Sequence, residues 1–293
     1  MRISCFGEVL WDIFPHHKKV GGAPLNVALR LKTMGMDSSI ITRVGVDDLG
    51  HDLITYIDKQ GLSSETIQKD YQHHTGEVLV SLDSQGTASY EISRPVAWDF
   101  IDNTEKALMD VKTSDAIIYG SLAARNEVSR NTLFELLDEA KFKILDVNLR
   151  PPHYNSELLS ELMKRADFIK LNDEELDNIC SYFKIKEITL EDQINALVTY
   201  TDTVQICVTK GGKGATLFYK DSFYYNSGYT IKVIDTVGAG DSFLGTLISK
   251  LLQGSEPQLA LDYASAIGAM VAGSAGANPV FTDNEIHDFI SQQ

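Results

Sequence analysis

Short apolar runs rich in β-branched residues alternate with segments of helical period along most of this chain. The runs occupy residues 3–9, 38–44, 116–119, 144–147, 168–171 and 205–209, and the helical segments occupy residues 24–34, 48–60, 127–140, 156–166 and 190–201. Strands that alternate with helices form right-handed βαβ units, so the strands run parallel in one sheet that helices cover. We therefore expect an α/β fold with ligands at the carboxyl ends of its strands.

Residues 75–98 break this alternation. Apolar side chains recur at alternating positions around a turn at Ser84-Gln85-Gly86, which is the pattern of a β-hairpin. A second short excursion precedes Gly21-Gly22. The two excursions together can form a small sheet that covers the strand ends as a lid; the alternative is a hairpin that extends the edge of the main sheet. The first interpretation gives a large α/β domain of residues 1–12, 21–72 and 99–293 and a β lid of residues 13–20 and 73–98.

Composition and charge argue against several classes of protein. A net charge of -15 argues against a nucleic-acid or anionic-membrane surface, since both need clustered Lys and Arg. No apolar run approaches the ~20 residues of a membrane span, and the first ten residues resemble a strand rather than a signal peptide. The cysteines Cys5, Cys180 and Cys207 fit neither a disulfide framework nor a zinc spacing, so a reducing cytoplasm is expected.

The stretch Asp235-Thr236-Val237-Gly238-Ala239-Gly240-Asp241-Ser242-Phe243 joins an apolar segment to a helix through a turn with almost no side chains. Such a turn can direct several main-chain N–H groups toward an anion at the helix N-terminus, and phosphate is the obvious candidate. Asp241 places a carboxylate beside this anion, which is costly unless it accepts a proton or pairs with a cation. The combination indicates phosphoryl transfer, whereas a lone Asp at a helix start is usually an N-cap.

Other strand ends carry residues suited to a sugar. Asp12 follows the first strand and can accept two hydroxyl hydrogen bonds, although a solvated loop Asp has the same pattern. Gly22 permits close approach of a ligand to the backbone, and the amide of Asn26 can both donate and accept; helix-start chemistry explains the same residues. Arg150 ends another strand and is one of few positive groups near the expected site.

Two further strand ends carry polar or glycine-rich segments. Asn172 and Glu175, three residues apart, would lie on one helix face and suit a hydrated Mg²⁺, although acidic residues at a helix start also act as caps. Thr209-Lys210-Gly211-Gly212-Lys213-Gly214 is a glycine-rich turn without the spacing of a Walker A loop, and a tight hairpin explains it equally well.

Taken together, these segments resemble the ribokinase-like, PfkB-type carbohydrate kinases from end to end. The resemblance rests on Gly21-Gly22-Ala23-Pro24-Leu25-Asn26-Val27-Ala28, on Gly45-Val46-Asp47-Asp48-Leu49-Gly50 and on the stretch from Asp235 to Phe243. Within the family the chain looks most like the fructokinases, through residues 7–12, 146–152 and 170–172. The resemblance implies a three-layer sandwich, with a mostly parallel central sheet between helices and a small β-sheet lid.

The resemblance also implies residue roles. Asp241 matches the catalytic base, and the N–H groups of Gly238, Ala239, Gly240 and Asp241 match the anion hole for the transferred phosphate. The matching sugar-binding positions are Asp12, Gly22 and Asn26, to which we add Arg94 and Arg150. Nucleotide, Mg²⁺ and phosphate positions are Asn172, Glu175, Thr209, Gly211 and Gly214, with Asn278 near the purine. Asp235, the rival base, together with backbone carbonyls of residues 272–277, resembles a monovalent-cation site in relatives that bind potassium.

The expected reaction is ATP-dependent, Mg²⁺-dependent phosphorylation of a neutral sugar. Arg94 is the only Lys or Arg within residues 75–98, whereas an already phosphorylated substrate would need more. Fructose, phosphorylated at its 6-hydroxyl, fits the resemblance best; ribose, 2-keto-3-deoxygluconate or a nucleoside remain alternatives, as does a non-catalytic sugar-binding protein. The exposed lid sheet offers edges and a face for a homodimer.

Overall fold

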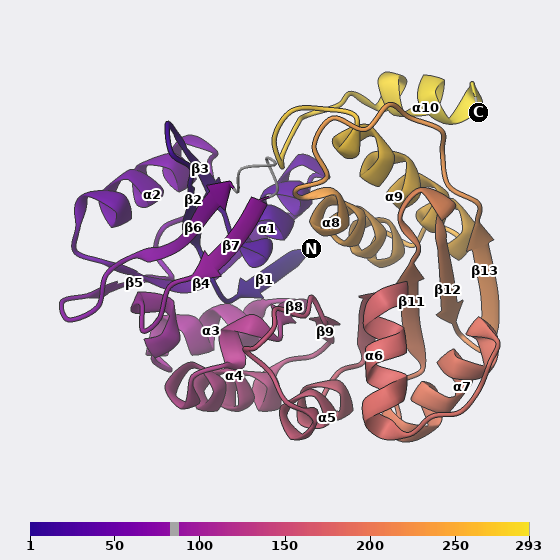
Figure 1. Ribbon diagram of the computed structural model, residues 1–293, viewed down its shortest axis with the longest axis horizontal. Helices are drawn as coiled ribbons and strands as arrows, with labels where there is room; N and C mark the ends of the chain where they lie inside the picture. Colours follow the sequence, from indigo (N-terminus) through magenta and orange to yellow (C-terminus); the bar gives the residue numbers. More distant parts are fainter. Residues whose placement is uncertain (83–87, 293) are drawn as a thin grey trace.

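The computed structural model describes residues 1–82 and 88–292. Its main sheet has nine strands in the order β13-β12-β11-β10-β9-β8-β1-β4-β5 (Figure 1). The bounds are β1 Arg2–Phe6, β4 Asp37–Gly45, β5 Ile67–Asp70, β8 Ala116–Gly120, β9 Lys143–Asp146, β10 Phe168–Asn172, β11 Gln205–Thr209, β12 Ala215–Tyr219 and β13 Ser222–Asn226.

In the order in which they lie in the sheet, the seven strands β5, β4, β1, β8, β9, β10 and β11 pair in parallel. The strands β12 and β13 add an antiparallel edge. The edge arises from hairpin connections. Tyr219 pairs with Ser222, so the turn contains only Lys220 and Asp221, whose φ angles of 49° and 58° are those that a two-residue hairpin turn requires. The expected mostly parallel sheet is confirmed.

Helices cover both faces of this sheet. Their bounds are α1 Ala23–Thr33, α2 Asp48–Lys59, α3 Glu105–Thr113, α4 Glu127–Glu139, α5 Ser156–Lys164, α6 Asp173–Phe183, α7 Leu190–Thr201, α8 Ala239–Leu252, α9 Pro257–Ala272 and α10 Asp283–Ser291, with short 3-10 turns η1 Ala97–Phe100, η2 Leu122–Ala124 and η3 Gly211–Lys213. Successive strand residues point to opposite faces. Cys5 accordingly packs in the core beneath α1, α2, α8 and α9, whereas Phe6 packs in the core beneath α3 to α7.

A separate four-stranded sheet has the order β3-β2-β6-β7 and lies on the left in Figure 1. Its strands are β2 Leu10–Ile13, β3 Lys18–Gly21, β6 Gly76–Leu82 and β7 Ala88–Ile92. The pairs β2–β3 and β6–β7 are antiparallel hairpins joined by a parallel β2–β6 pair. The alternative of a hairpin that extends the main sheet is therefore wrong. The expected turn at residues 84–86 lies outside the described residues.

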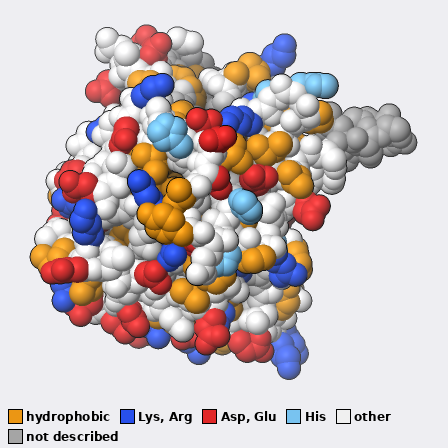
Figure 2. Space-filling view, turned by 90° about the vertical axis from the view of Figure 1, so that its left-hand side faces the viewer, with side chains coloured by type: hydrophobic (Ala, Val, Ile, Leu, Met, Phe, Trp, Pro, Cys, Tyr) orange, Lys and Arg blue, Asp and Glu red, His pale blue; other side chains and the backbone are white. Residues whose placement is uncertain are grey.

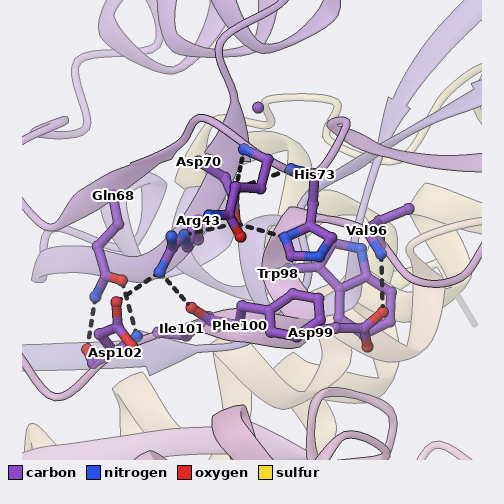
Figure 3. A network of polar contacts seen from close by, with 12 residues as sticks. Arg43, Gln68, Asp70, His73, Val96, Trp98, Asp99, Phe100, Ile101 and Asp102 are labelled. Carbon is purple, nitrogen blue, oxygen red and sulfur yellow. Dashed lines mark hydrogen bonds and ion pairs between the residues drawn. The ribbon is translucent and has the colours of Figure 1, made fainter.

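A polar network fixes the base of this small sheet, where the chain leaves the main domain after β5 and returns at η1. The carboxylate of Asp70 lies 2.9 Å from Nε of Arg43 and accepts the main-chain N–H of His73. Arg43 also donates to the carbonyl of Phe100 and pairs with Asp102, while the His73 ring stacks on Phe100 at 3.8 Å (Figure 3). The outgoing and returning segments are thus tied to the same strand, β4.

Acidic and basic side chains are interspersed on the face of the molecule that Figure 2 presents. Among residues 1–82 and 88–292, no helix is both long enough and apolar enough to cross a membrane.

Candidate active site

Asp241 lies in the first turn of α8, where the carboxyl ends of the parallel strands face the small sheet. Its Oδ2 accepts a hydrogen bond of 2.8 Å from Nδ2 of Asn26, on the first turn of α1. The Oδ1 of Asn26 in turn accepts from Nδ2 of Asn278 at 2.8 Å. Desolvation and, next, the charge of Asp146 raise the pKa of Asp241 to about 6, against the opposing effect of the hydrogen bond from Asn26. This carboxylate therefore changes protonation near neutral pH.

The glycine turn before Asp241 has the geometry of an anion hole. Gly238 has φ 78°, and a Cβ on it would lie 2.6 Å from atoms of Ala277, so no other residue fits. The N–H of Ala239 donates to the carbonyl of Thr236. The next two N–H groups, of Gly240 and Asp241, have no acceptor within the described residues. Two free donors at the positive end of a helix suit a phosphoryl group.

A buried ion pair lies beneath this turn, and sequence reasoning gave neither of its members a role. Nζ of Lys170, on β10, is 3.0 Å from Oδ1 of Asp146 at the end of β9. A Cβ on Gly240 would be 3.4 Å from the same Nζ, so the ammonium group is close to the anion hole. The charges of Asp146, Glu175 and Asp241 raise the pKa of Lys170 against the effect of its burial. The sequence does contain a signal for this ion pair: Lys170 is a charged residue within an apolar strand, and a buried charge needs a partner.

Glu175 and Asn172 form a reciprocal capping box at the start of α6. Oδ1 of Asn172 accepts the N–H of Glu175, and Oε2 of Glu175 accepts the N–H of Asn172. Oε1 of Glu175 accepts the N–H of Leu149, which ties α6 to the loop after β9. Each carboxylate oxygen retains a lone pair. Within residues 1–82 and 88–292, no three His, Cys, Asp or Glu residues gather as a metal cage. The side-chain oxygens of Asn172 and Glu175 are of the type that binds a hydrated magnesium ion.

The expected sugar-side residues lie around the junction of β1, the small sheet and α1. Gly22 is the N-cap of α1 with φ 111°, and a Cβ there would lie 2.4 Å from the carbonyl oxygen of Glu8. Asp12 is half-buried on β2; desolvation raises its pKa, whereas the charges of Lys19 and Arg150 lower it. The charge of Arg150 also lowers the pKa of Asp241. A Cβ on Gly21, the residue before Gly22, would lie 2.7 Å from Oδ2 of Asp12, so the Asp12 carboxylate lies beside this backbone.

Glu8, which we had not singled out, is buried at the end of β1. Desolvation raises its pKa to about 7, with Arg150, Asp241 and Arg125 as its charged neighbours. Its Oε2 makes no hydrogen bond to the described residues.

A cavity of about 460 Å³ opens on the other side of the glycine turn. Apolar atoms of α8, α9 and the segment that precedes α8 make up much of its wall, through Val233, Phe243, Gly268, Ala269 and Ala272. The expected nucleotide residues Thr209, Gly211 and Gly214 line it together with Ala239 and Gly240. A largely apolar cavity beside an anion hole has the chemistry for a nucleotide.

Asp235 lies at the opposite end of the glycine turn from Asp241. Its Oδ1 accepts the N–H of Val237, and its Oδ2 is 3.4 Å from Nζ of Lys19 on the small sheet. The N–H groups of Ile234 and Asp235 both donate to the carbonyl of Ala272. The two segments that we expected to hold a monovalent cation are therefore adjacent.

Two expected residues lie elsewhere than anticipated. Asn278, expected beside the purine, hydrogen-bonds Asn26 and is absent from the lining of the 460 Å³ cavity. Arg94, expected beside the sugar, lines a separate cavity at the base of the small sheet.

Comparison with known proteins agrees with this geometry. The model of the pfkB family carbohydrate kinases matches residues 5–284. A fructokinase from Vibrio alginolyticus is 29% identical, with 98% of each chain covered. One similar solved structure is a fructokinase double mutant from Vibrio cholerae in its fructose, ADP and potassium ion bound form. Its TM-score is 0.84 at 23% sequence identity, and the alignment covers 99% of this chain and 98% of the fructokinase chain. An ATP complex of a Pyrococcus horikoshii sugar kinase has a TM-score of 0.82 at 25% identity, with 98% and 99% covered. The chain belongs to the pfkB family of carbohydrate kinases.

Proposed function

We propose that this protein is a fructokinase that transfers the γ-phosphoryl group of ATP to the 6-hydroxyl of fructose. The observation that carries the proposal is the position of Asp241. Its carboxylate accepts a hydrogen bond from Asn26, which is on the expected sugar side. The preceding residues Ala239 and Gly240 line the cavity on the expected nucleotide side. The curated relatives named fructokinase support the choice of sugar.

Asp241 acts as the general base. In its ionised form it accepts the proton of the sugar hydroxyl while the hydroxyl oxygen forms a bond to the γ-phosphorus, and the bond from phosphorus to the bridging oxygen of ADP breaks. Proton loss can occur late in a loose phosphoryl-transfer transition state, so a carboxylate of modest basicity is adequate. The pKa of about 6 keeps Asp241 mostly ionised at neutral pH.

The free N–H groups of Gly240 and Asp241 and the ammonium of Lys170 stabilise the charge of the transferred group. Asn172 and Glu175 would hold Mg²⁺, which would supply positive charge to the phosphates of the nucleotide. Asp146 keeps Lys170 protonated in its buried position, since an isolated buried ammonium group would lose its proton. Closure of the small sheet as a lid, with residues 73–98 as its larger part, excludes water.

The test is release of ADP from ATP across a panel of fructose, ribose, 2-keto-3-deoxygluconate, fructose 6-phosphate and a nucleoside. We expect the highest kcat/KM with fructose. Activity only with fructose 6-phosphate, or ATP turnover with none of these sugars, would refute the proposal. A sugar acid is the one alternative that a specific observation favours, because the charge of Arg150 acts on both Asp12 and Asp241.

Three accessory features belong to the same proposal. Asp235 and the carbonyls after Ala272 bind potassium, because the two segments adjoin and the Vibrio cholerae relative was solved with this ion. The reaction takes place in the cytoplasm, where free thiols such as the three buried cysteines persist. Exposed Leu79 on the small sheet forms part of a homodimer contact. Leu79→Glu should then dissociate the dimer in light scattering, and a wild-type monomer would disprove this contact.

A further inference from the structure

A second cavity, of about 450 Å³, lies at the base of the small sheet. The chain segment that returns from β7, the start of α4 and the loop before α5 form its walls. The lining includes Arg94, Asp99, Arg125, Arg130 and His153. It shares no residue with the cavity between η3 and α8, and Asp241 and Asn26 are not part of it.

Positive charge is concentrated in this cavity. Three of the eight arginines of a chain with net charge -15 line it. Arg125 is neutralised, because its Nε is 2.7 Å from Oδ1 of Asp99. Within the described residues, the guanidinium of Arg94 makes no ion pair or hydrogen bond, and Arg130 makes only a 3.4 Å contact from Nη1 to the carbonyl of Ala124. Two positive charges therefore lack a carboxylate partner.

Arg125 is a buried part of the cavity wall, and not all of its donors are paired. Its side chain is only 5% exposed, stacks on Trp98 at 4.0 Å, and donates through Nη2 to the carbonyl of Ser93. Its buried Nη1 has no acceptor in the described residues, and the buried Nδ1 of His153, which donates or accepts according to the tautomer, has no hydrogen-bond partner there either. Unpaired buried donors are rare because each costs free energy.

Neutral donors complete the wall. Asn126 and Asn155 use Oδ1 to cap α4 and α5, by accepting the N–H groups of Val128 and Leu158. Their Nδ2 groups have no acceptor within residues 1–82 and 88–292. The cavity is thus rich in donors and poor in acceptors, which is the complement of a polyhydroxylated anion.

We infer that this cavity binds a small phosphorylated molecule of the sugar phosphate class, with its phosphate held by Arg94, Arg125 and Arg130. A dianion balances the two uncompensated charges, and guanidinium groups match phosphate oxygens in geometry. A volume of about 450 Å³ lies in the range of small-molecule sites and leaves room for an organic portion beside Asn126 and Asn155. The first test below does not depend on the proposed function, because it follows His153 inside this cavity, whereas the second also uses binding of fructose 6-phosphate to the active site as the product of the proposed reaction.

The first test uses His153 in the wild-type protein as a local probe. Burial lowers the pKa of His153, and the positive charges of Arg125 and Arg94 lower it further, while Asp99 opposes them. A bound phosphate dianion offsets these cations and must raise this pKa. The ring-proton resonance, assigned with His153→Gln, is titrated against pH with fructose 6-phosphate, inorganic phosphate or fructose present. An unchanged pKa with millimolar fructose 6-phosphate would overturn the inference, as would an equal effect of neutral fructose.

The second test compares Arg130→Gln with Arg165→Gln by calorimetric titration. Arg165 is also on a helix end and pairs with Asp138 and Glu161 outside this cavity, so it is a matched control. Arg130→Gln should weaken one of two binding events for fructose 6-phosphate about tenfold, the loss expected for one charge-assisted contact. Arg165→Gln should change neither event, and kcat should stay the same in both variants. Equal weakening by both substitutions would refute the site; equal affinity for inorganic phosphate would refute the sugar phosphate class.

Discussion

Replacing Asp241 with Asn should inactivate the protein and at the same time stabilise it above neutral pH. The loss of the general base should lower kcat by about 10²- to 10⁴-fold, whereas the binding of sugar and ATP stays measurable. The stability gain arises because the wild-type protein must ionise Asp241 in a desolvated position next to Asp146. An amide at this position carries no charge and can still accept from Asn26.

The size and sign of this gain follow from the two pKa values. The folded pKa of about 6 lies above the ordinary value of 3.8, so the folded state holds the proton more tightly and wild-type stability falls as pH rises through this interval. A shift of roughly two units corresponds to on the order of 3 kcal/mol, which we reduce to about 1–2 kcal/mol because one side of Asp241 faces solvent. For a chain of 293 residues that is an increase in Tm of about 2–3 °C above pH 7.

Thermal unfolding at pH 8 and pH 4.5, together with steady-state rates, tests this reasoning. The stability gain should be full at pH 8 and mostly lost at pH 4.5, where wild-type Asp241 is protonated in the folded state. Asp235→Asn is the matched control, since it removes a carboxylate at the other end of the same turn. It should retain far more turnover than Asp241→Asn. Near-normal kcat in Asp241→Asn, or a Tm gain equal at both pH values, would contradict the argument.

Four further outcomes are expected. The wild-type kcat/KM should fall tenfold per pH unit below about pH 6, as Asp241 is protonated, and a flat profile down to pH 5 would exclude this group as the base. Lys170→Met should lower the free energy of unfolding by about 3–5 kcal/mol in urea, because it leaves Asp146 buried and unpaired; the double variant with Asp146→Asn should regain stability but not kcat. Gly22→Ala should cost over ~2 kcal/mol in the same assay, far more than Gly35→Ala, whose Cβ meets no atom within 4 Å. Gly268→Val should raise the KM for ATP about tenfold and leave the sugar KM unchanged, since its side chain would enter the 460 Å³ cavity.

The elements with strong local signals were predictable from the sequence. The strands that became β8 to β11 are short apolar runs between helical segments, and their order along the chain fixes parallel neighbours. The helix α9, Pro257–Ala272, was not predicted because it is buried on most sides and carries little amphipathic contrast. The strand β5, Ile67–Asp70, reads Ile-Gln-Lys-Asp and owes its place to pairing with β4 rather than to its own propensity.

The same distinction applies to the candidate site. Gly22, Gly238 and Asp241 could be singled out because a positive φ or a helix start leaves a local trace in sequence. The pair of Lys170 and Asp146 could not, since the two residues lie 24 positions apart and meet only because β9 and β10 are neighbours. The sequence also does not show that Arg94, Arg125 and Arg130 line the same cavity. Their proximity depends on the path of the chain segment that returns from the small sheet to the main sheet.

An acidic chain that handles phosphate has to place its few cations where they act, and the structure suggests two ways of doing so. Lys170 is buried beneath the glycine turn and held protonated by Asp146, so its charge acts at short range in a medium of low dielectric constant. Arg94 and Arg130 lack carboxylate partners among the described residues, so their charge remains available to a ligand. A paired cation suits a fixed role in catalysis, because its protonation is secured. An arginine keeps its charge even without a carboxylate partner. Arg94 and Arg130 therefore act as ligand-binding groups of the second cavity and not as members of structural ion pairs.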